Sequence, residues 1–245
     1  MRILNYVASV SGGKDSIAMF ELILERGLPL DAVIFFDTGM EFSSVYRNMN
    51  RVKRKCIIRG ILFIRLNPPQ SFLYQMLKKP ITGRKNSDHI GKGWCGGPCR
   101  WGTTQKTQAI HKLVKKRWIH QYIGIASDEP QRIKEDRNKL YPLVEMGMSE
   151  KDCLAYCRKK GYSWREGDYD LYDLLDRVSC WCCRNKNLRE LKNYYYYLPH
   201  YGARLKALEA RIGKPMKKRY TLEELEERFS REGDPQVVPR YRGVK

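Results

Sequence analysis

The sequence lacks any apolar run long enough to cross a bilayer. A membrane-spanning helix needs roughly 20 consecutive apolar residues, and no apolar stretch of this chain approaches that length. The residues that follow Met1 also hold no apolar signal-peptide core and no small-residue cleavage site. We therefore expect a protein of the cytoplasm with no membrane partner.

Acidic residues are scarce. The chain has 27 Asp and Glu against 47 Lys and Arg, which gives a formal net charge of +20. Half of this excess falls in residues 78–117, where eleven Lys or Arg face a single acid, Asp88. Clustered positive charge has sequence-independent affinity for phosphate backbones, so nucleic acid, either tRNA or DNA, is a candidate partner. The alternative is a basic surface that is only solvated.

Histidine motifs for metal binding are absent, because the four His residues form no HxxH or HExxH pattern. Eight cysteines in a chain without an export signal are better explained as metal ligands, redox thiols or core residues than as disulfides. The best ligand set comes from two short segments, with Cys182 as a substitute: Cys95, Cys99, Cys180 and Cys183. Four thiolates suit zinc or an iron–sulfur cluster. The spacing differs from zinc ribbons, in which CxxC occurs twice, and free or redox-active thiols stay an alternative.

Short apolar runs alternate with helical patterns through residues 1–145. Runs typical of strands occupy 3–10, 31–39, 60–66 and 121–132. Helical spacing covers 15–26, 42–55 and 103–116. This alternation predicts an α/β fold, a doubly wound and mostly parallel sheet with right-handed crossovers. Ligands of such sheets bind at the carboxyl ends of the strands, so one rim is expected to carry residues 11–16, 37–39 and 127–132.

Beyond residue 145 the sequence is mainly helical and carries the second cysteine segment. Helical spacing covers 149–160, 169–176, 185–198, 201–212 and 221–231. We therefore divide the chain into three parts. These are an α/β core over 1–145, a helical C-terminal region over 146–232 that packs on the core, and a loose basic tail over 233–245.

The first strand runs into a glycine turn with the sequence SGGKDS, residues 11–16. Glycines adopt backbone angles that other residues avoid and expose successive N–H groups at a helix N-terminus, where phosphate binds. Lys14 adds a mobile cation, and Ser11 and Ser16 add hydroxyls. The turn is not a Walker A loop, since the GxxxxGK[ST] spacing is absent. The alternative is an ordinary helix start capped by Ser or Asp.

SGGKDS resembles the PP-loop of the N-type ATP pyrophosphatase superfamily. Four further segments occur in an order that resembles the phosphoadenosine phosphosulfate reductase family, over about residues 5–195. They are FFDTGMEF at 35–42, IGIASDEPQRI at 123–133, LYPLVEMGMSEKDCLAYCRKKG at 140–161 and LYDLLDRVSCWCC at 171–183. The resemblance implies that the α/β core is a Rossmann-like, PP-loop nucleotide-binding core. Relatives that this chain resembles carry iron–sulfur clusters, which favours a cluster over zinc at the cysteines.

The resemblance also assigns a nucleotide site. It implies that Lys14 and Asp15 are catalytic and that the glycine turn holds the pyrophosphate through Ser11, Gly12, Gly13, Lys14, Asp15 and Ser16. Asp37 and Thr38 would meet the adenosine. Arg132 would reach a phosphate or a sulfate, since its guanidinium suits bidentate contacts.

Three functions are compatible with these motifs. In the first, ATP with Mg²⁺ is cleaved to AMP and pyrophosphate, and the adenylated substrate then accepts sulfur from a donor protein. Nucleic acid or a small metabolite would be the acceptor. In the second, a cysteine thiol reduces a sulfonucleotide. We favour the first, because the complete SGGKDS resembles the ATP-using branch and no cysteine follows Cys183, whereas sulfonucleotide reductases resemble one another in a C-terminal Glu-Cys-Gly-Ile/Leu-His segment. The third is a non-catalytic nucleic-acid-binding module with a structural metal.

Overall fold

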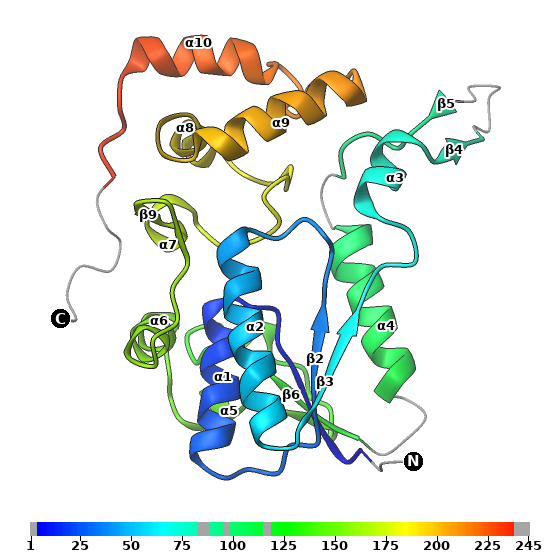
Figure 1. Cartoon of the computed structure of the whole chain (residues 1–245), viewed down its shortest axis with the longest axis vertical. Coiled ribbons are helices and arrows are strands. Elements are labelled where there is room, and N and C mark those ends of the chain that lie inside the picture. Colours follow the sequence, from blue (N-terminus) through cyan, green and yellow to red (C-terminus); the bar gives the residue numbers. More distant parts are fainter. Residues whose placement is uncertain (1–3, 83–88, 96–98, 115–118, 238–245) are drawn as a thin grey trace.

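The computed structural model describes residues 4–82, 89–95, 99–114 and 119–237, and in these residues five strands form the central sheet (Figure 1). The strands, in their order across the sheet, are β3 (Leu62–Leu66), β2 (Ala32–Phe36), β1 (Tyr6–Ser9), β6 (His120–Ile123) and β7 (Lys139–Leu140). Every neighbouring pair is parallel. The predicted parallel sheet is confirmed, with β7 as a strand that the sequence did not predict.

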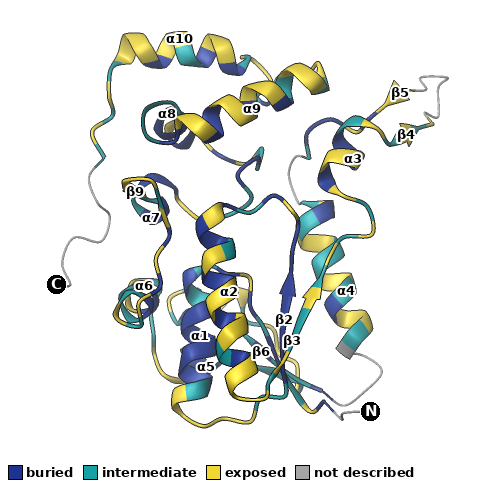
Figure 2. Cartoon of the chain, in the orientation of Figure 1, coloured by how far each residue is buried: buried dark blue, intermediate teal, exposed yellow. Residues whose placement is uncertain are grey.

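Helices cover both faces of this sheet. α1 (Lys14–Glu25) and α2 (Ser43–Ile58) lie on one face, and α4 (Gln105–Val114) lies on the other (Figure 1). β2 is buried along its whole length (Figure 2), as its unbroken apolar sequence predicts. Each face has its own apolar core, a large one that includes Phe20 of α1 and a smaller one that includes Ile110 of α4. The doubly wound α/β class is confirmed.

The chain reverses its direction across the sheet next to β1. From β1 it proceeds to β2 and β3 on one side, and it then returns to β6 on the other side of β1. Sheets of this class bind ligands in the crevice that forms where the strand order reverses, beyond the carboxyl ends of the strands. The glycine turn follows β1 directly and lies at this position.

The C-terminal part adds helices beside and above the sheet (Figure 1). α6 (Glu150–Lys159) packs on α1, whereas α8 (Leu188–Tyr197), α9 (Pro199–Ile212) and α10 (Leu222–Glu232) pack on one another. One apolar core extends from β1 to Phe229 of α10. The division of the chain at residue 145 stays a prediction, and residues 238–245 of the expected basic tail lie outside the described residues.

Several short elements were not predicted. They are α3 (Phe72–Leu77), β4 (Pro80–Ile81), β5 (His89–Ile90), η2 (Pro130–Arg132), α5 (Pro142–Glu145), β8 (Arg165–Glu166) and β9 (Tyr169–Asp170). The first residues of the helix expected over 103–116 belong to a π-helical turn, η1 (Arg100–Thr104), and its residues 115–116 lie outside the described part. The helix expected over 169–176 is confirmed only as the short α7 (Leu171–Leu174); it is wrong at its start, where β9 pairs with β8. Elements this short show no periodic apolar pattern.

Among the helices that the structure describes, none combines the length and the apolar composition needed to span a membrane.

Candidate active site

The glycine turn fits closely between β1 and α2. Gly12 has a φ of +84°, which residues with a side chain rarely adopt. A Cβ atom at this position would lie 2.6 Å from Val45 Cγ1 of α2. The Ser16 hydroxyl closes the turn, because it donates to the Gly13 carbonyl at 2.9 Å and accepts the Ser11 N–H at 3.1 Å. Both the backbone conformation and the available space therefore require glycine at position 12.

Four backbone amides of the turn are available to a ligand. Among the described residues, no acceptor binds the N–H groups of Gly12, Gly13, Asp15 and Ser16. The Lys14 N–H is engaged, since it donates to the Tyr172 hydroxyl at 2.7 Å. Unpaired amides at the N-terminus of a helix attract anions. The arrangement suits a phosphate group at the predicted position.

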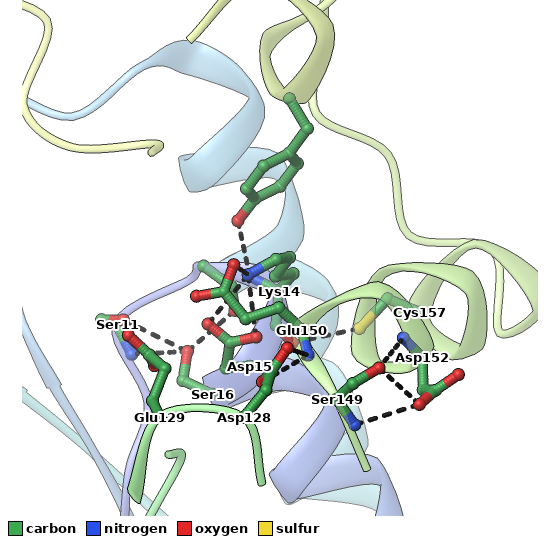
Figure 3. Close-up of polar contacts among 12 residues, drawn as sticks. Ser11, Lys14, Asp15, Ser16, Asp128, Glu129, Ser149, Glu150, Asp152 and Cys157 are labelled. Carbon is green, nitrogen blue, oxygen red and sulfur yellow. Dashed lines mark hydrogen bonds and ion pairs between the residues drawn. The ribbon is translucent and has the colours of Figure 1, made fainter. Parts of the chain in front are cut away.

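Lys14 lies in a cage of carboxylates beside the turn (Figure 3). Its ammonium nitrogen lies 3.0 Å from Asp15 Oδ1 and 3.1 Å from Glu150 Oε2, and the residue is only 4% exposed. Burial acts to lower the pKa of Lys14, but the two carboxylates outweigh it and raise the pKa above 10.5. The glycine turn predicted a mobile cation at this position. The structure instead shows an immobilised one, because Glu150 reaches it from α6.

A third carboxylate, that of Glu129, lies close to the two that hold Lys14. Oxygen atoms of Asp15, Glu129 and Glu150 all lie within 4.8 Å of one another. Burial raises the pKa of Asp15 above its ordinary value of 3.8, and the nearby Lys14 opposes this shift. Carboxylate oxygens at such separations are the hard donors that Mg²⁺ prefers. This carboxylate cluster, defined by the three residues, is a set of donors that fits a divalent cation.

The C-terminal part of the chain holds the glycine turn in place. The Trp164 indole N–H donates to the Gly12 carbonyl at 2.8 Å, and the Cys157 thiol donates to the Lys14 carbonyl at 3.2 Å. Together with the Tyr172 hydroxyl, these groups engage the backbone of the turn from the side of α6 and α7. Trp164 and Cys157 are fully buried. The turn is therefore positioned by residues about 150 positions further along the chain.

A cleft of about 850 Å³ opens next to the turn and is lined by Ser11, Ser16, Gly124 and Arg132, among others. Its volume is typical of small-molecule sites. Gly124, at the end of β6, has no room for a side chain, since a Cβ atom there would lie 2.8 Å from Ser16 Cα. Arg132 forms an ion pair with Glu129 of the carboxylate cluster. The predicted residues Ser11, Ser16 and Arg132 thus lie around one cavity.

Lys106 of α4 also lines this cleft, and the sequence analysis did not single it out. It is half-buried, and no carboxylate among the described residues forms an ion pair with it. Burial lowers the pKa of Lys106, and the Glu41 carboxylate opposes this. Lys106 is therefore a cation in the cleft with capacity for an anionic ligand.

The end of β2 places Asp37 and Thr38 away from the lining of this cleft. The Asp37 carboxylate is buried and accepts hydrogen bonds from the Gly39 N–H at 2.8 Å, from the Tyr46 hydroxyl at 2.8 Å and from Arg65. The Thr38 hydroxyl donates to Glu41 Oε1 at 2.6 Å. Burial raises the pKa of Glu41. Whether Asp37 and Thr38 contact adenosine stays a prediction.

The first cysteine segment brings two thiols together. The sulfur atoms of Cys95 and Cys99 lie 3.8 Å apart, and Cys99 also accepts the Gly102 N–H at 3.1 Å. Sulfur ligands of a tetrahedral zinc ion, each about 2.3 Å from the metal, are separated by about 3.8 Å. The hydrogen bond from Cys95 lowers the pKa of Cys99 to about 5.

The second cysteine segment meets the end of β2. Cys180 Sγ lies 3.5 Å from the Thr38 hydroxyl and 3.7 Å from Glu41 Oε1. Burial raises the pKa of Cys180. Cys182 is buried, and Cys183 is half-buried. In the part of the chain that the structure describes, no three thiols of the predicted set lie within 4.8 Å of one another. The structure therefore pairs Cys95 with Cys99 and brings Cys180 to Thr38, without gathering all four thiols.

The family model of the phosphoadenosine phosphosulfate reductase domain matches residues 5–138, which is 134 of 245 residues and more than half of the chain. The chain belongs to this family. It is thus a member of a PP-loop enzyme family that binds adenine nucleotides. No curated protein matches the chain. The match to the phosphoadenosine phosphosulfate reductase domain includes the glycine turn, Arg132, Cys95 and Cys99, whereas the second cysteine segment and α6 to α10 follow it.

Several residues of the site escaped the sequence analysis because they approach the turn only in the folded chain. They are Glu41, Lys106, Gly124, Glu129, Glu150, Trp164 and Tyr172. Five of these residues lie inside segments that carry the family resemblance, so their position was an available signal: Glu41, Gly124, Glu129, Glu150 and Tyr172. Lys106 and Trp164 had no such signal.

Proposed function

We propose that the protein binds ATP with Mg²⁺ at the glycine turn and transfers AMP to a substrate for sulfur transfer. A substrate oxygen attacks the α-phosphorus, the bond to the bridging oxygen breaks, and pyrophosphate leaves with the electron pair of that bond. A sulfur nucleophile then displaces AMP from the adenylated substrate. Nucleic acid is the acceptor that the charge of the chain favours.

The observation that carries this proposal is the carboxylate cluster beside the open amides. Asp15, Glu129 and Glu150 bring three negative charges, and the two cations that pair with them, Lys14 and Arg132, leave one negative charge in excess. A polyphosphate next to these carboxylates would be repelled unless a divalent cation lay between them. ATP bound with Mg²⁺ meets this requirement. A sulfonucleotide reduction uses a thiol and has no step that needs such a cation.

The residues of the turn then have separate tasks. The four unpaired amides, which include that of Ser16, and the Ser11 hydroxyl would bind phosphate oxygens, and Arg132 and Lys106 would neutralise charge at the cleft. The carboxylate cluster would hold Mg²⁺, which supplies charge neutralisation to the pyrophosphate that leaves. Lys14 would keep the carboxylates of Asp15 and Glu150 together. Asp37 and Thr38 are assigned to the adenosine side by the family resemblance.

The cysteines would hold an iron–sulfur cluster, with zinc as the alternative. The ligands would be Cys95, Cys99, Cys180 and Cys183, with Cys182 as a substitute. The separation of Cys95 and Cys99 supports a shared metal. The buried Trp181 indole N–H also supports a ligand nearby, since it has no acceptor among the described residues. Such a centre would supply soft, thiolate-bound metal chemistry at this end of the site.

The test is anaerobic incubation with ATP labelled at the α-phosphate and with Mg²⁺, in the presence and absence of RNA or DNA. We expect labelled AMP and unlabelled pyrophosphate. Lys14→Ala should weaken ATP binding at least tenfold, because Asp15 and Glu150 would then repel each other and the ligand. Lys53→Ala, an exposed lysine of α2, is the matched control. Release of ADP, or equal binding by Lys14→Ala and the control, would reject the proposal.

A second candidate is sulfonucleotide reduction, which the Cys99 thiol favours. The hydrogen bond from Cys95 lowers the pKa of this thiol, and a lower pKa increases the fraction of thiolate, which is the nucleophile. The thiolate would attack the sulfur of a bound phosphosulfate, form S-sulfocysteine and release the nucleotide phosphate. Consumption of a sulfonucleotide, without cleavage of ATP, would support this candidate.

A further inference from the structure

The second half of α9 and the segment that connects it to α10 are strongly basic. Residues 204–219 contain seven Lys or Arg and a single acid, Glu209. The Glu209 carboxylate accepts the backbone N–H groups of Met216 at 2.6 Å and Leu222 at 2.7 Å. The one acid of the segment thus orders the backbone. We name residues 211–220 the basic loop.

The cations of the basic loop face solvent without carboxylate partners. Arg211, Lys214, Lys218 and Arg219 are exposed, and within the described ranges none of them forms an ion pair. This differs from Lys206 one helical turn earlier, which pairs with Glu226 at 2.5 Å. Concentrated positive charge without internal neutralisation favours a polyanionic partner.

Both cysteine segments contact the basic loop. The Trp94 indole N–H, next to Cys95, donates to the Lys214 carbonyl at 2.9 Å. On the other side, Arg184, which follows Cys183, donates to the Met216 carbonyl at 2.9 Å, and Lys217 donates to the Arg184 carbonyl at 2.8 Å. Residues 80 or more positions apart in the sequence therefore meet at this loop. A chain bound on it would lie beside the thiols.

The hairpin that precedes Cys95 extends the basic surface. A Cβ atom on Gly93 would lie 3.5 Å from Ile212 Cγ2 of α9, so the hairpin abuts the start of the loop. Its Lys78 and Lys92 are exposed, and neither has a carboxylate partner in the described part of the chain. Figure 1 shows β4, β5 and α3 next to the end of α9. Two segments thus form one positively charged face.

An exposed aromatic ring completes this face. Tyr220, at the end of the basic loop, is 40% exposed, and its backbone pairs with Lys217 in an isolated bridge. Aromatic rings among cations bind unpaired bases by stacking while the cations bind phosphates. Folded RNA presents unpaired bases in loops and ends, whereas DNA presents them only after its duplex opens. A stacking surface among free cations therefore favours RNA.

We propose that the basic loop, together with Lys92, is the docking surface for a single-stranded segment of RNA, with one base stacked on Tyr220. The loop would deliver this RNA to the two cysteine segments, which contact it through Trp94 and Arg184. The inference rests on the proposed function in one respect. That function explains why RNA would be brought to the cysteines, since RNA would be the acceptor of sulfur. The binding itself does not depend on that reaction.

The test measures the fluorescence anisotropy of a labelled single-stranded RNA of about 15 nucleotides with the full chain, over a series of salt concentrations. The triple variant Lys214→Gln, Lys218→Gln, Arg219→Gln should bind about tenfold more weakly. The slope of log affinity against log salt should fall by about 2, at about 0.7 per lost phosphate contact. The matched control removes three exposed cations of α2 and of the residue that follows it, Lys53→Gln, Arg54→Gln and Arg59→Gln, and should retain the slope.

Tyr220→Ala tests the stacking contact separately. We expect binding of the RNA to weaken about fivefold or more, with the salt slope unchanged, because a lost base stack removes no phosphate contact. Equal losses in the two triple variants would show that only net charge matters and would overturn the proposal. Equal or tighter binding of duplex DNA of the same sequence would also overturn it.

ATP binding by the same variants separates this inference from the proposed function. All of them should bind ATP as the unaltered chain does, since the basic loop does not line the cleft. If the chain fails to bind ATP but the triple variants differ in RNA binding as expected, the proposed function fails and the docking surface stands. If ATP is cleaved and the two triple variants bind RNA alike, the docking surface fails and the function stands.

Discussion

The region beyond the carboxyl end of β1 and the region beyond the carboxyl end of β2 differ in the atoms that they offer to a ligand. Beyond β1 the side chains and backbone present hard groups, namely unpaired amides, hydroxyls and the carboxylate cluster. Beyond β2 they present sulfur, with Cys180 against Thr38 and Cys99 close to Gly102. Carboxylate oxygens select Mg²⁺ and the unpaired amides bind phosphate, whereas thiolates select soft metals. One rim of the sheet can therefore serve two kinds of chemistry, because the two kinds of site do not compete for the same metal ions.

Burial differs between these two ends as well. Ser11 and Ser16 line an open cleft, so a nucleotide can enter without a change in the fold. The thiol end is more enclosed, since Cys182 and Trp181 are buried and Lys186 is only 2% exposed. Burial raises the pKa of Cys180 and of Cys182, and the Lys186 cation only partly opposes this shift at Cys182. The first end is suited to exchange of a ligand, and the second is suited to retention of one.

The largest expected effect is the loss of bound metal when thiols are removed. The double variant Cys99→Ser, Cys180→Ser should carry no thiolate-bound metal after anaerobic purification, because one ligand of each segment is gone. Elemental analysis and the absorbance spectrum measure this. ATP affinity should change less than twofold. Cys56→Ala, which removes a buried thiol of α2, is the control and should keep the metal. If the double variant lost ATP binding together with the metal, the two regions would not be separate sites.

The next effect concerns the contact between β6 and the glycine turn. Gly124→Ala places a Cβ atom within 3 Å of the backbone of Ser16, and overpacking of this kind costs about 1–3 kcal/mol. We expect ATP affinity, measured by calorimetry, to fall about tenfold to 100-fold, with the metal content unchanged. Gly202→Ala in α9 is the matched control, since its nearest neighbour would be 3.6 Å away. Unchanged ATP affinity in Gly124→Ala would refute the placement of the site.

A smaller effect should follow from Tyr172→Phe. This change leaves the Lys14 N–H without its acceptor, and an unsatisfied buried N–H costs about 1–3 kcal/mol. We expect the free energy of unfolding, measured with urea, to fall by this amount and the affinity for ATP to fall as the turn loosens. Tyr74→Phe removes a hydroxyl from an exposed ring and should change neither quantity. The prediction is wrong if both variants behave alike.

The smallest effect is a pH dependence of ATP binding. Burial raises the pKa of Asp15 above 3.8, so protons compete with Mg²⁺ at a higher pH than at an exposed aspartate. ATP affinity with Mg²⁺ should be complete above the raised pKa and decline as the pH falls through it, by less than about tenfold per pH unit. The contribution of Asp15 to the stability of the ligand-free fold has the opposite sign, since the folded state binds the proton more tightly. Asp15→Asn should abolish the decline in affinity.

The sequence predicted the parts of the molecule in which local pattern and tertiary structure agree. The turn after β1, the start of α1 near Lys14 and the buried β2 follow from apolar runs that end in polar residues. β7 escaped prediction because two residues show no alternation. The cage around Lys14 escaped it for another reason: Glu150 begins a helix far along the chain, and its carboxylate reaches Lys14 only when α6 packs on α1. Local pattern carries no information on such a contact.

The hydrogen bond from Trp164 to Gly12 has a consequence for biosynthesis. The part of the chain that matches the family ends at residue 138, whereas Trp164 and Tyr172 hold the backbone of the turn from positions beyond it. A ribosome that has released only the first half of the protein has therefore exposed a sheet whose phosphate-binding turn still lacks its supports. The ability to hold a nucleotide should arise late in translation, and a fragment cut after residue 138 should be deficient in it.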